Sequence, residues 1–417
     1  MMLVYVLNKD GNPLMPCKAS KARKLLKFNK AKVVNRTPFT IQLLYGSSGY
    51  KQSTILGVDT GSKNIGLSVT TNKQELFSAE VLLRDDIVEK LSTRREMRKV
   101  RRNRNTRYRQ PRFNNRIKNK KDGWLPPSAL QKINSHIQII NKIYKVLPIS
   151  NIIIEVASFD IQKIKNPDIQ GVEYQQGEQL GFWNVREYVL FRDNHVCQCC
   201  KGKSKDKILN VHHIESRKTG GDSPNNLITL CETCHQKYHK GELNVSLKRN
   251  TKSLRNEALM NSTRWILYKK IKEIYPNCKL TYGYITKNKR IKNNLPKTHA
   301  VDAFCISNNL SAERLNYYYQ YKCMRNHNRQ IHKIQIYKGN VRKPHNLGKY
   351  VKGFQAFDKV KILNIDMVGF IKARRVRGVF TISDIYGNAF KDVSYKKIKL
   401  LESRKSMLVE LQYQNIK

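Results

Sequence analysis

Three acidic residues that lie far apart in the chain could together hold catalytic metal ions. Asp59 and Glu155 each follow a short apolar run, and Asp302 lies three residues after His299. Short apolar runs predict buried strands, and the i, i+3 spacing of His299 and Asp302 places both on one face of a helix. A two-metal site that cleaves phosphodiesters needs several carboxylates on rigid elements. These four residues therefore form a candidate nuclease site.

A second group of candidate metal ligands falls within residues 182–242. Two Cys-x2-Cys pairs, separated by 30 residues, have the spacing of a closed tetrahedral zinc site. The four thiolate ligands would be Cys197, Cys200, Cys231 and Cys234. Cys199 lies inside the first pair, and we interpret it as a bystander. The spacing predicts one structural Zn²⁺ in this segment.

Histidines lie around the second cysteine pair. His212 and His213 precede it, and His235 and His239 follow. They could be further zinc ligands or surface residues. Because four thiolates already complete a zinc site, the histidines are available for a second, catalytic metal, and imidazole is suited to proton abstraction near neutral pH.

The charge of the chain indicates a polyanionic partner. The 417 residues include 80 Lys and Arg against 31 Asp and Glu, which gives a formal net charge of +49. A nucleic-acid backbone could balance this charge, whereas a neutral or acidic protein could not. Residues 93–116 hold ten Arg and one Lys against one acid. Such like charges repel along a free helix, so we expect this segment to be a nucleic-acid-binding helix. Its expected contact residues are Arg94, Arg95, Arg98, Arg101, Arg102, Arg104, Arg107, Arg109 and Arg112.

The acids need a layered α/β domain to position them. Strands are expected at 55–60 and 64–69 around a tight glycine turn, and another at 151–156. Between them, a 3.6-residue apolar period predicts an amphipathic helix with its apolar face formed by Leu130, Ile133, Ile137, Ile140, Tyr144 and Leu147. A helix at 258–275 and a strand near 279–286 then lead to His299. Strand, helix, strand is an α/β order.

The two ends of the chain differ from this pattern. Residues 1–52 predict a first strand, a turn at Pro13 and Pro16, a basic helix at 20–30 and a strand at 37–44. From about 312, tyrosines mixed with Lys and Arg indicate a basic segment that contacts nucleic acid. Residues 355–402 predict the short strands of a small barrel-like module.

The cysteine-flanked segment resembles an HNH nuclease (ββα-metal) domain, on the basis of His213, Asn226 and His235. The resemblance implies that His213 is the general base that activates water for attack on a phosphodiester. It implies that Asn226 orients the loop carrying this base, and that His212 and His235 hold one Mg²⁺. Many relatives have a carboxylate where this chain has His212.

The rest of the chain resembles a RuvC-like nuclease, because Asp59, Glu155, His299 and Asp302 match its split motifs. This resemblance implies an RNase H-like fold with two Mg²⁺. A RuvC-like domain interrupted by an Arg-rich helix and then by HNH is similar to CRISPR RNA-guided effector nucleases. The compact length and the Pro-Leu-Met-Pro motif at 13–16 resemble the IscB family, their transposon-associated relatives, over nearly the whole chain.

The expected fold class is therefore multidomain α/β, with an RNase H-like (RuvC) core split by an Arg-rich bridge helix and by an inserted zinc-containing HNH domain. The expected domains are an N-terminal PLMP-motif domain (1–52), RuvC-like part I (53–83), the bridge helix (84–122), RuvC-like part II (123–165), a linker (166–181), the HNH domain (182–242), a linker with RuvC-like part III (243–311), a basic RNA/DNA-interaction segment (312–354) and a β-rich module that reads the target-adjacent motif (355–417).

The function implied is RNA-guided cleavage of double-stranded DNA, with HNH cutting the guide-paired strand and the RuvC-like site the displaced strand. The expected partners are a long structured guide RNA and target DNA, bound by a monomeric protein. One alternative is a protein-only HNH endonuclease of restriction or homing type, which would need little RNA-binding charge. Another is a non-catalytic RNA-binding protein with relic sites.

The compartment expected is a reducing, prokaryotic cytoplasm, with the protein associated with the nucleoid. No apolar run reaches the roughly 18 residues of a membrane span. The N-terminus lacks the basic region and cleavage site of a signal peptide, so it predicts a strand. Nine cysteines, four of them in pairs with metal-ligand spacing, do not suggest a disulfide framework.

Overall fold

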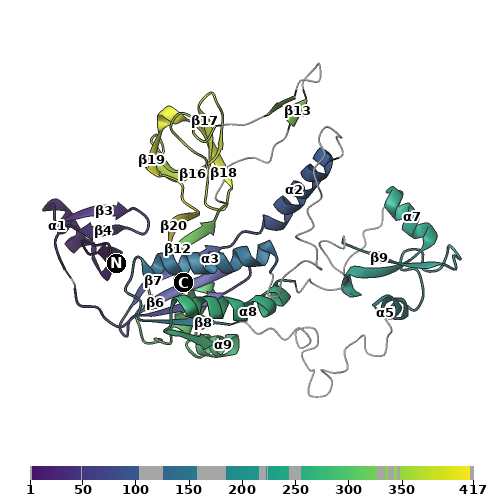
Figure 1. Ribbon diagram of the computed structural model, residues 1–417, viewed down its shortest axis with the longest axis horizontal. Coiled ribbons are helices and arrows are strands. Elements are labelled where there is room, and N and C mark those ends of the chain that lie inside the picture. Colours follow the sequence, from purple (N-terminus) through teal and green to yellow (C-terminus); the bar gives the residue numbers. More distant parts are fainter. Residues whose placement is uncertain are drawn as a thin grey trace. The chain divides into compact units, whose positions relative to one another are not determined.

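The chain divides into two compact units, which are described separately (Figure 1). The computed structural model describes residues 2–47, 49–102, 125–156, 185–215, 222, 224–243, 255–325, 334–336, 342–344 and 348–413. The larger unit comprises Met1–Ser158 and Ser262–Lys417, and the smaller unit comprises Phe159–Asn261. The predicted insert at 182–242 falls within the smaller unit. Among the described residues, no helix combines the length and apolar composition needed to cross a membrane.

A seven-stranded mixed sheet forms the centre of the described part of the larger unit. In spatial order its strands are β11 (Cys278–Thr281), β8 (Asn151–Glu155), β5 (Ile55–Thr60), β6 (Asn64–Thr70), β7 (Glu75–Leu82), β12 (Tyr317–Cys323) and β20 (Met407–Tyr413). β5 and β8, and likewise β8 and β11, run parallel. β6 runs antiparallel to both of its neighbours, β5 and β7, and the β5–β6 pairing is the one that the glycine turn predicts. The mixed α/β architecture is confirmed.

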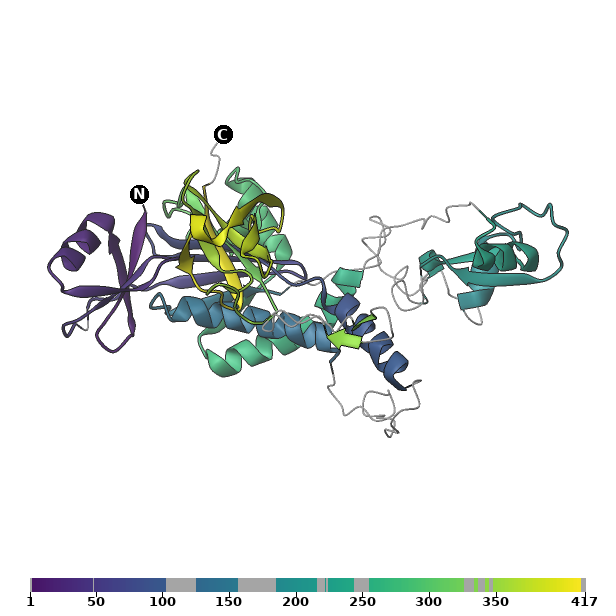
Figure 2. The same cartoon turned by 90° about the horizontal axis from the view of Figure 1, so that it is seen from above.

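The two faces of this sheet differ in composition because side chains alternate along each strand. Leu56 and Val58 are fully buried in an apolar core with residues of α3 (Pro127–Tyr144) and α8 (Arg255–Ile274). Figure 2 shows these two helices lying along the same side of the sheet. Gly57 and Asp59 belong to the opposite face, which is covered by α10 (His299–Ile306).

α10 lies on the sheet at a distance that only glycine permits. A methyl group placed on Gly66 would lie 1.9 Å from the carbonyl oxygen of His299, and one placed on Gly57 would lie 2.1 Å from that of Ala303. These glycines let the helix backbone approach the strands. They thereby bring His299 and Asp302 down to Asp59.

The amphipathic helix is confirmed, but the predicted apolar face is partly wrong. Leu130 is exposed, and the buried stripe instead passes through Ile133, His136, Ile140 and Ile143. The prediction followed apolar residues alone and so skipped His136, which is fully buried. The true face is therefore rotated from the one expected.

Two further expectations about this unit are wrong. The strand expected near 279–286 ends at Thr281, and α9 (Gly283–Lys292) begins two residues later. The tyrosines at 317–321, expected to begin a basic nucleic-acid segment, form β12 in the central sheet. β12 pairs with β7 and β20, and Tyr317, Tyr319 and Tyr321 are buried. Alternate aromatic residues on a strand fill a core as well as they would stack on bases.

The N-terminal part is a four-stranded sheet with one helix. Its order is β2 (Pro13–Lys18), β1 (Leu3–Leu7), β4 (Thr40–Leu43) and β3 (Ala31–Asn35), and α1 (Ala19–Lys27) packs on it. The first strand and the basic helix are confirmed. The two prolines do not form a turn. They lie in the edge strand β2, where a missing N–H costs no ladder hydrogen bond.

The C-terminal part is β-rich, as expected. An antiparallel sheet has the order β18 (Ala389–Ser394), β17 (Val379–Ser383), β16 (Met367–Arg374), β15 (Lys359–Ile362) and β19 (Ile398–Glu402), with the short helix η4 (Tyr395–Lys397) before β19. β13 (Ile334–Ile336) and β14 (Arg342–Pro344) pair separately. β20 leaves this module and joins the central sheet.

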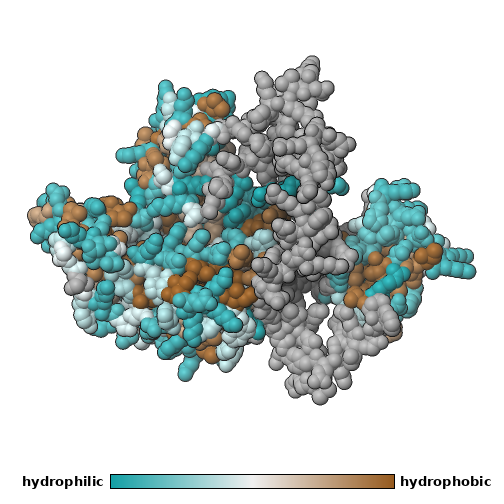
Figure 3. All heavy atoms as spheres, in the orientation of Figure 1, coloured by the Kyte–Doolittle hydropathy of each residue, from teal (hydrophilic) through white to brown (hydrophobic). Residues whose placement is uncertain are grey.

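The described part of the Arg-rich segment, which ends at Arg102, is helical. α2 (Ile87–Arg102) carries exposed side chains at Arg94, Arg95 and Arg98, and the last turn contains Arg101 and Arg102. Arg104, Arg107, Arg109 and Arg112 lie outside the described residues. Figure 3 shows hydrophilic side chains over most of the visible face of the larger unit.

The smaller unit contains a β-hairpin followed by a helix. α5 (Val185–Arg192) precedes β9 (Leu209–His213), and η3 (Pro224–Asn226) precedes β10 (Leu227–Cys231), which pairs antiparallel with β9. α7 (Glu232–Lys240) follows at once. The segment with the candidate metal ligands therefore has the strand–strand–helix order that the resemblance implied.

Candidate functional sites

Asp59 and Glu155 meet through the register of two parallel strands. Val58 of β5 pairs with Ile154 of β8, so the next residue on each strand points to the same face of the sheet. This face is the one covered by α10. Two carboxylates 96 positions apart in the chain are thus neighbours at the carboxyl ends of their strands.

α10 adds the other two predicted residues. His299 Nδ1 lies 2.6 Å from Oδ2 of Asp59, and its Nε2 lies 3.1 Å from the side-chain amide of Asn64. Asp302 Oδ1 is paired with the guanidinium of Arg290 at 3.0 Å. All four residues predicted at this site come together, from segments at 59, 155 and 299–302. We refer to them as the acidic site.

Two carboxyl groups of the acidic site, Glu155 and Asp302, have raised pKa values. Burial and the nearby charge of Asp59 raise the pKa of Glu155 to about 7. Burial and the same charge raise the pKa of Asp302, which Arg290 partly offsets. The hydrogen bond to Asp59 raises the pKa of His299. Like charges at close range disfavour ionisation, and a bound cation removes that penalty. The oxygen-rich donor set fits Mg²⁺.

Two side chains that the sequence analysis did not single out brace this site. The Thr286 hydroxyl of α9 donates to Oε2 of Glu155. Oε1 of Glu80, on β7, accepts from the backbone N–H of Ala300 in the first turn of α10. A carboxylate at a helix N-terminus is favourable because the free N–H groups point at it. Neither residue lies in a recognisable motif, so spacing could not have found them.

The four cysteines of the smaller unit converge as predicted. The sulfur atoms of Cys197, Cys200, Cys231 and Cys234 all lie within 4.8 Å of one another, and each cysteine is free of disulfides. Cys200 Sγ lies 3.8 Å from Cys231 Sγ. A tetrahedral Zn²⁺ with bonds of about 2.3 Å places its sulfurs about 3.8 Å apart. The donor set therefore fits zinc.

Three histidines form a second cluster in this unit, which we call the histidine site. The ring nitrogens of His212, His235 and His239 lie within 4.8 Å of one another, and Nε2 of His235 is 3.3 Å from Nε2 of His239. Burial and the neighbouring rings lower the pKa of His212 to about 4, so it stays neutral and can bind a metal. His239, which the resemblance did not name as a ligand, belongs to the histidine site because it lies one helical turn after His235 on α7.

His213 points away from this cluster. Adjacent residues on a strand face opposite sides, so His212 joins the histidine site while His213 Nε2 lies 2.9 Å from Oδ1 of Asp222. Asp222 is a further residue that the sequence analysis left without a role. A carboxylate on one ring nitrogen fixes which nitrogen remains free to accept a proton.

Asn226 fixes the backbone just after His213 by hydrogen bonds. Its Oδ1 accepts from the backbone N–H of Glu215 and its Nδ2 donates to the Glu215 carbonyl, both at 2.9 Å. Asn226 is fully buried whereas Glu215 is exposed, so the two bonds are partly buried. The position that the resemblance assigned to an orienting residue makes these contacts.

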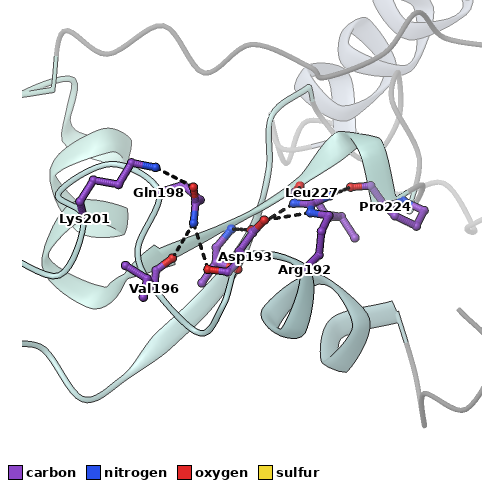
Figure 4. Close-up of polar contacts among 8 residues, drawn as sticks. Arg192, Asp193, Val196, Gln198, Lys201, Pro224 and Leu227 are labelled. Atoms are coloured by element: carbon purple, nitrogen blue, oxygen red, sulfur yellow. Dashed lines mark hydrogen bonds and ion pairs between the residues drawn. The ribbon is translucent and has the colours of Figure 1, made fainter. Parts of the chain in front are cut away.

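A polar network holds Pro224 and Leu227, which lie on either side of Asn226 in the chain (Figure 4). Arg192, at the end of α5, donates to the carbonyls of Pro224 and Leu227 at 2.8 and 2.9 Å and to the carboxylate of Asp193. Asp193 in turn accepts from the backbone N–H of Thr229 at 2.9 Å. The segment that flanks Asn226 is therefore fixed to α5.

Two family models match separate segments of the chain. Residues 197–241 match the family model of the HNH endonucleases. The chain carries an HNH endonuclease domain. Residues 4–177 match the model of the RRXRR proteins. A stretch of 59 residues is 46% identical to anaredoxin of Nostoc sp., covering 14% of this chain and 74% of that protein, and so shares a family with it.

Solved structures of Cas9 show a distant likeness. Cas9 of Streptococcus thermophilus in complex with the GGAA PAM aligns with a TM-score of 0.33 at 14% identity, over 60% of this chain and 32% of that one. The Type II-C Cas9 of Actinomyces naeslundii aligns with a TM-score of 0.24 at 10% identity, over 62% of this chain and 60% of that one. This chain thus covers less than two thirds of either protein.

Proposed function

We propose that this protein is an RNA-guided DNA endonuclease with two separate metal-dependent sites. The observation that carries the proposal is the assembly of Asp59, Glu155, His299 and Asp302 at one end of a sheet, in a unit distinct from the one that holds the HNH domain. One chain with two complete candidate nuclease sites is suited to cutting two strands. The single-site alternatives leave one of these sites without a role.

At the acidic site, Asp59, Glu155 and Asp302 would hold two Mg²⁺. The ions would supply charge stabilisation to the attacking and leaving oxygens of a phosphodiester. His299 would fix the orientation of the Asp59 carboxylate, while Thr286 and Arg290 fix those of Glu155 and Asp302. The RuvC-like, RNase H-like assignment is supported by the way split segments of the chain deliver these groups to one edge.

At the histidine site, His212, His235 and His239 would hold one divalent ion, which would stabilise charge on the phosphate as it is cleaved. Three imidazoles favour a transition metal such as Zn²⁺, Fe²⁺ or Ni²⁺ more than the Mg²⁺ first expected. His213 would accept a proton from the attacking water. With its Nε2 hydrogen directed at Asp222, Nδ1 is the nitrogen that remains free.

The four cysteines would hold a structural Zn²⁺ that does no chemistry. α7 connects the two metal sites of the smaller unit, because Cys234 and His235 are consecutive residues. A zinc ion at the cysteines would therefore fix the direction in which His235 points.

The charge of the chain supports a bound nucleic acid, and the resemblance suggests that this nucleic acid is a guide RNA. The exposed arginines of α2 and the net charge of +49 call for a polyanion that stays bound, and base pairing by an RNA would supply the sequence specificity. By resemblance, the HNH domain would cut the paired strand and the acidic site the displaced one. The C-terminal module would read the short motif beside the target.

The test is RNA dependence. Protein purified from its native host should carry one discrete, long RNA species, and sequencing that RNA should give the target. Removing the RNA with ribonuclease should abolish cleavage of a plasmid bearing the target, and adding the same RNA back should restore it. Cleavage that survives ribonuclease unchanged would favour a protein-only HNH endonuclease and contradict the proposal.

A further inference from the structure

Two tyrosines lie beside the carboxylate of Glu155. β11 ends opposite Glu155 in the sheet, and Tyr282, Gly283 and Tyr284 follow directly. A methyl group placed on Gly283 would lie 3.1 Å from Oε1 of Glu155. The chain between the two tyrosines therefore borders the acidic site, and the tyrosines lie at its edge.

The rings of these tyrosines are parallel and exposed. Their centroids are 6.2 Å apart with an interplanar angle of 11°. Tyr282 is 39% exposed and Tyr284 is 66% exposed. Most of the large aromatic residues of this sheet, such as Phe77 and Tyr319, are instead fully buried. Two parallel rings in solvent at the edge of a candidate nuclease site offer a flat apolar surface to a substrate.

The helix that begins between these rings is basic. α9 carries Lys287, Lys289, Arg290 and Lys292 and no acidic residue. Arg290 is paired with Asp302, whereas Lys287 and Lys292 have exposed side chains. An aromatic surface followed by exposed positive charge is the combination that binds single-stranded nucleic acid, since bases stack on the rings while cations track the phosphates.

We propose that Tyr282 and Tyr284 form a stacking platform for unpaired bases of the DNA strand that is cut at the acidic site. The proposal rests on the proposed function, because it takes the acidic site as the place of cleavage. In a duplex each base face is covered by its neighbours, so the platform can engage only a strand that has been unpaired. The platform would thus position the displaced strand and help the acidic site to reject intact duplex.

The first experiment measures binding of the full-length protein to labelled oligo-dT of about 20 nucleotides, without added Mg²⁺ so that the strand is not cleaved. It is done at about 0.5 M NaCl, where phosphate contacts are weakened and stacking is retained. Tyr284→Ala should weaken binding about tenfold, within the range that loss of one stacked base gives, whereas Tyr284→Phe keeps the ring and should bind like wild type. Tyr50→Ala is the matched control, since Tyr50 is 86% exposed and lies in the connection before β5.

The same variants are then compared for binding to a duplex of equal length and to oligo-U. The platform predicts a loss confined to single strands and at least as large for DNA as for RNA. It is overturned if Tyr284→Ala binds oligo-dT like wild type, if single strands and duplex lose affinity equally, or if only RNA binding falls.

A cleavage assay separates the failure of this inference from that of the proposed function. In the His213→Ala background, nicking of the displaced strand should fall about tenfold with Tyr284→Ala and stop with Asp59→Ala. Nicking that continues with Asp59→Ala contradicts the proposed function itself. If Asp59→Ala is inactive and Tyr284→Ala is fully active, the proposed function is supported and the stacking platform is refuted.

Discussion

The acidic site and the histidine site bring their candidate metal ligands together in opposite ways. The acidic site gathers Asp59, Glu155, His299 and Asp302 from three distant segments, and its geometry depends on strand register and on how closely α10 approaches the sheet. The histidine site takes its ligands from residues 212–239, a single hairpin and helix held by the neighbouring cysteines. The acidic site should therefore lose activity when the fold of the larger unit is disturbed. The histidine site should lose activity when the neighbouring cysteines no longer hold the hairpin and helix.

The largest effect should come from removing zinc. Cys231→Ser deletes one of four ligands in a unit whose small core is built around the cysteines. Structural zinc contributes on the order of 10 kcal/mol to folding, as much as the whole stability of many domains. We expect the smaller unit to unfold and cleavage at the histidine site to stop, while nicking at the acidic site continues.

Elemental analysis and strand-specific cleavage together check this. Wild type should contain one tightly held zinc per chain that Cys231→Ser lacks, and Cys199→Ser, the matched control, should retain it. Active wild-type protein without zinc would refute the assignment.

A change at Gly66 should have the opposite result, with loss of the acidic site and retention of the histidine site. In Gly66→Ala the new methyl group would overlap the His299 carbonyl, so α10 must move away from the sheet. The cost should reach or exceed the roughly 1–3 kcal/mol typical of overpacking, and nicking at the acidic site should be lost while the histidine site stays active. The control is Gly46→Ala, because a methyl group there meets no atom within 4 Å.

The measurements are a thermal melt and strand-specific cleavage for each variant. If Gly66→Ala kept full activity at the acidic site, the close approach of α10 would not be needed to position His299 and Asp302.

A smaller, local effect is expected at Asn226. Asn226→Ala removes two part-buried hydrogen bonds to the Glu215 backbone, and a typical hydrogen bond contributes about 0.5–1.5 kcal/mol. Cleavage at the histidine site should slow while zinc content stays at one per chain. The neighbouring Asn225→Ala serves as the control. A loss of zinc in Asn226→Ala would show that the residue supports the unit as a whole, not the loop after His213.

The same contrast explains how far the sequence could predict each site. The cysteine and histidine ligands of the smaller unit follow from spacing because they are close in the chain, and His239 could have been added from its i, i+4 relation to His235. The acids could be chosen because each ends an apolar strand or shares a helix face with a histidine. The residues around these acids could not be predicted from the sequence, because Thr286, Glu80 and Arg290 reach the site only through tertiary packing.

The errors in the fold have a related cause. Periodicity assigned the face of α3 from its apolar residues, but packing buries His136 and exposes Leu130. The tyrosines of β12 looked like a nucleic-acid surface because an aromatic residue that stacks on a base and one that fills a core look alike in sequence. Long-range pairing between β7 and β12 decides between these roles, and no local pattern reveals it.

The central claim is that two independent sites cut two strands, and one assay addresses it most directly. A target duplex with a different label on each strand is incubated with the protein–RNA complex of wild type, Asp59→Ala or His213→Ala, and both strands are resolved on a denaturing gel. We predict that wild type cuts both strands, that His213→Ala cuts only the displaced strand, and that Asp59→Ala cuts only the paired strand. If either single substitution abolished both cuts, or if neither abolished one, the two-site account would be contradicted.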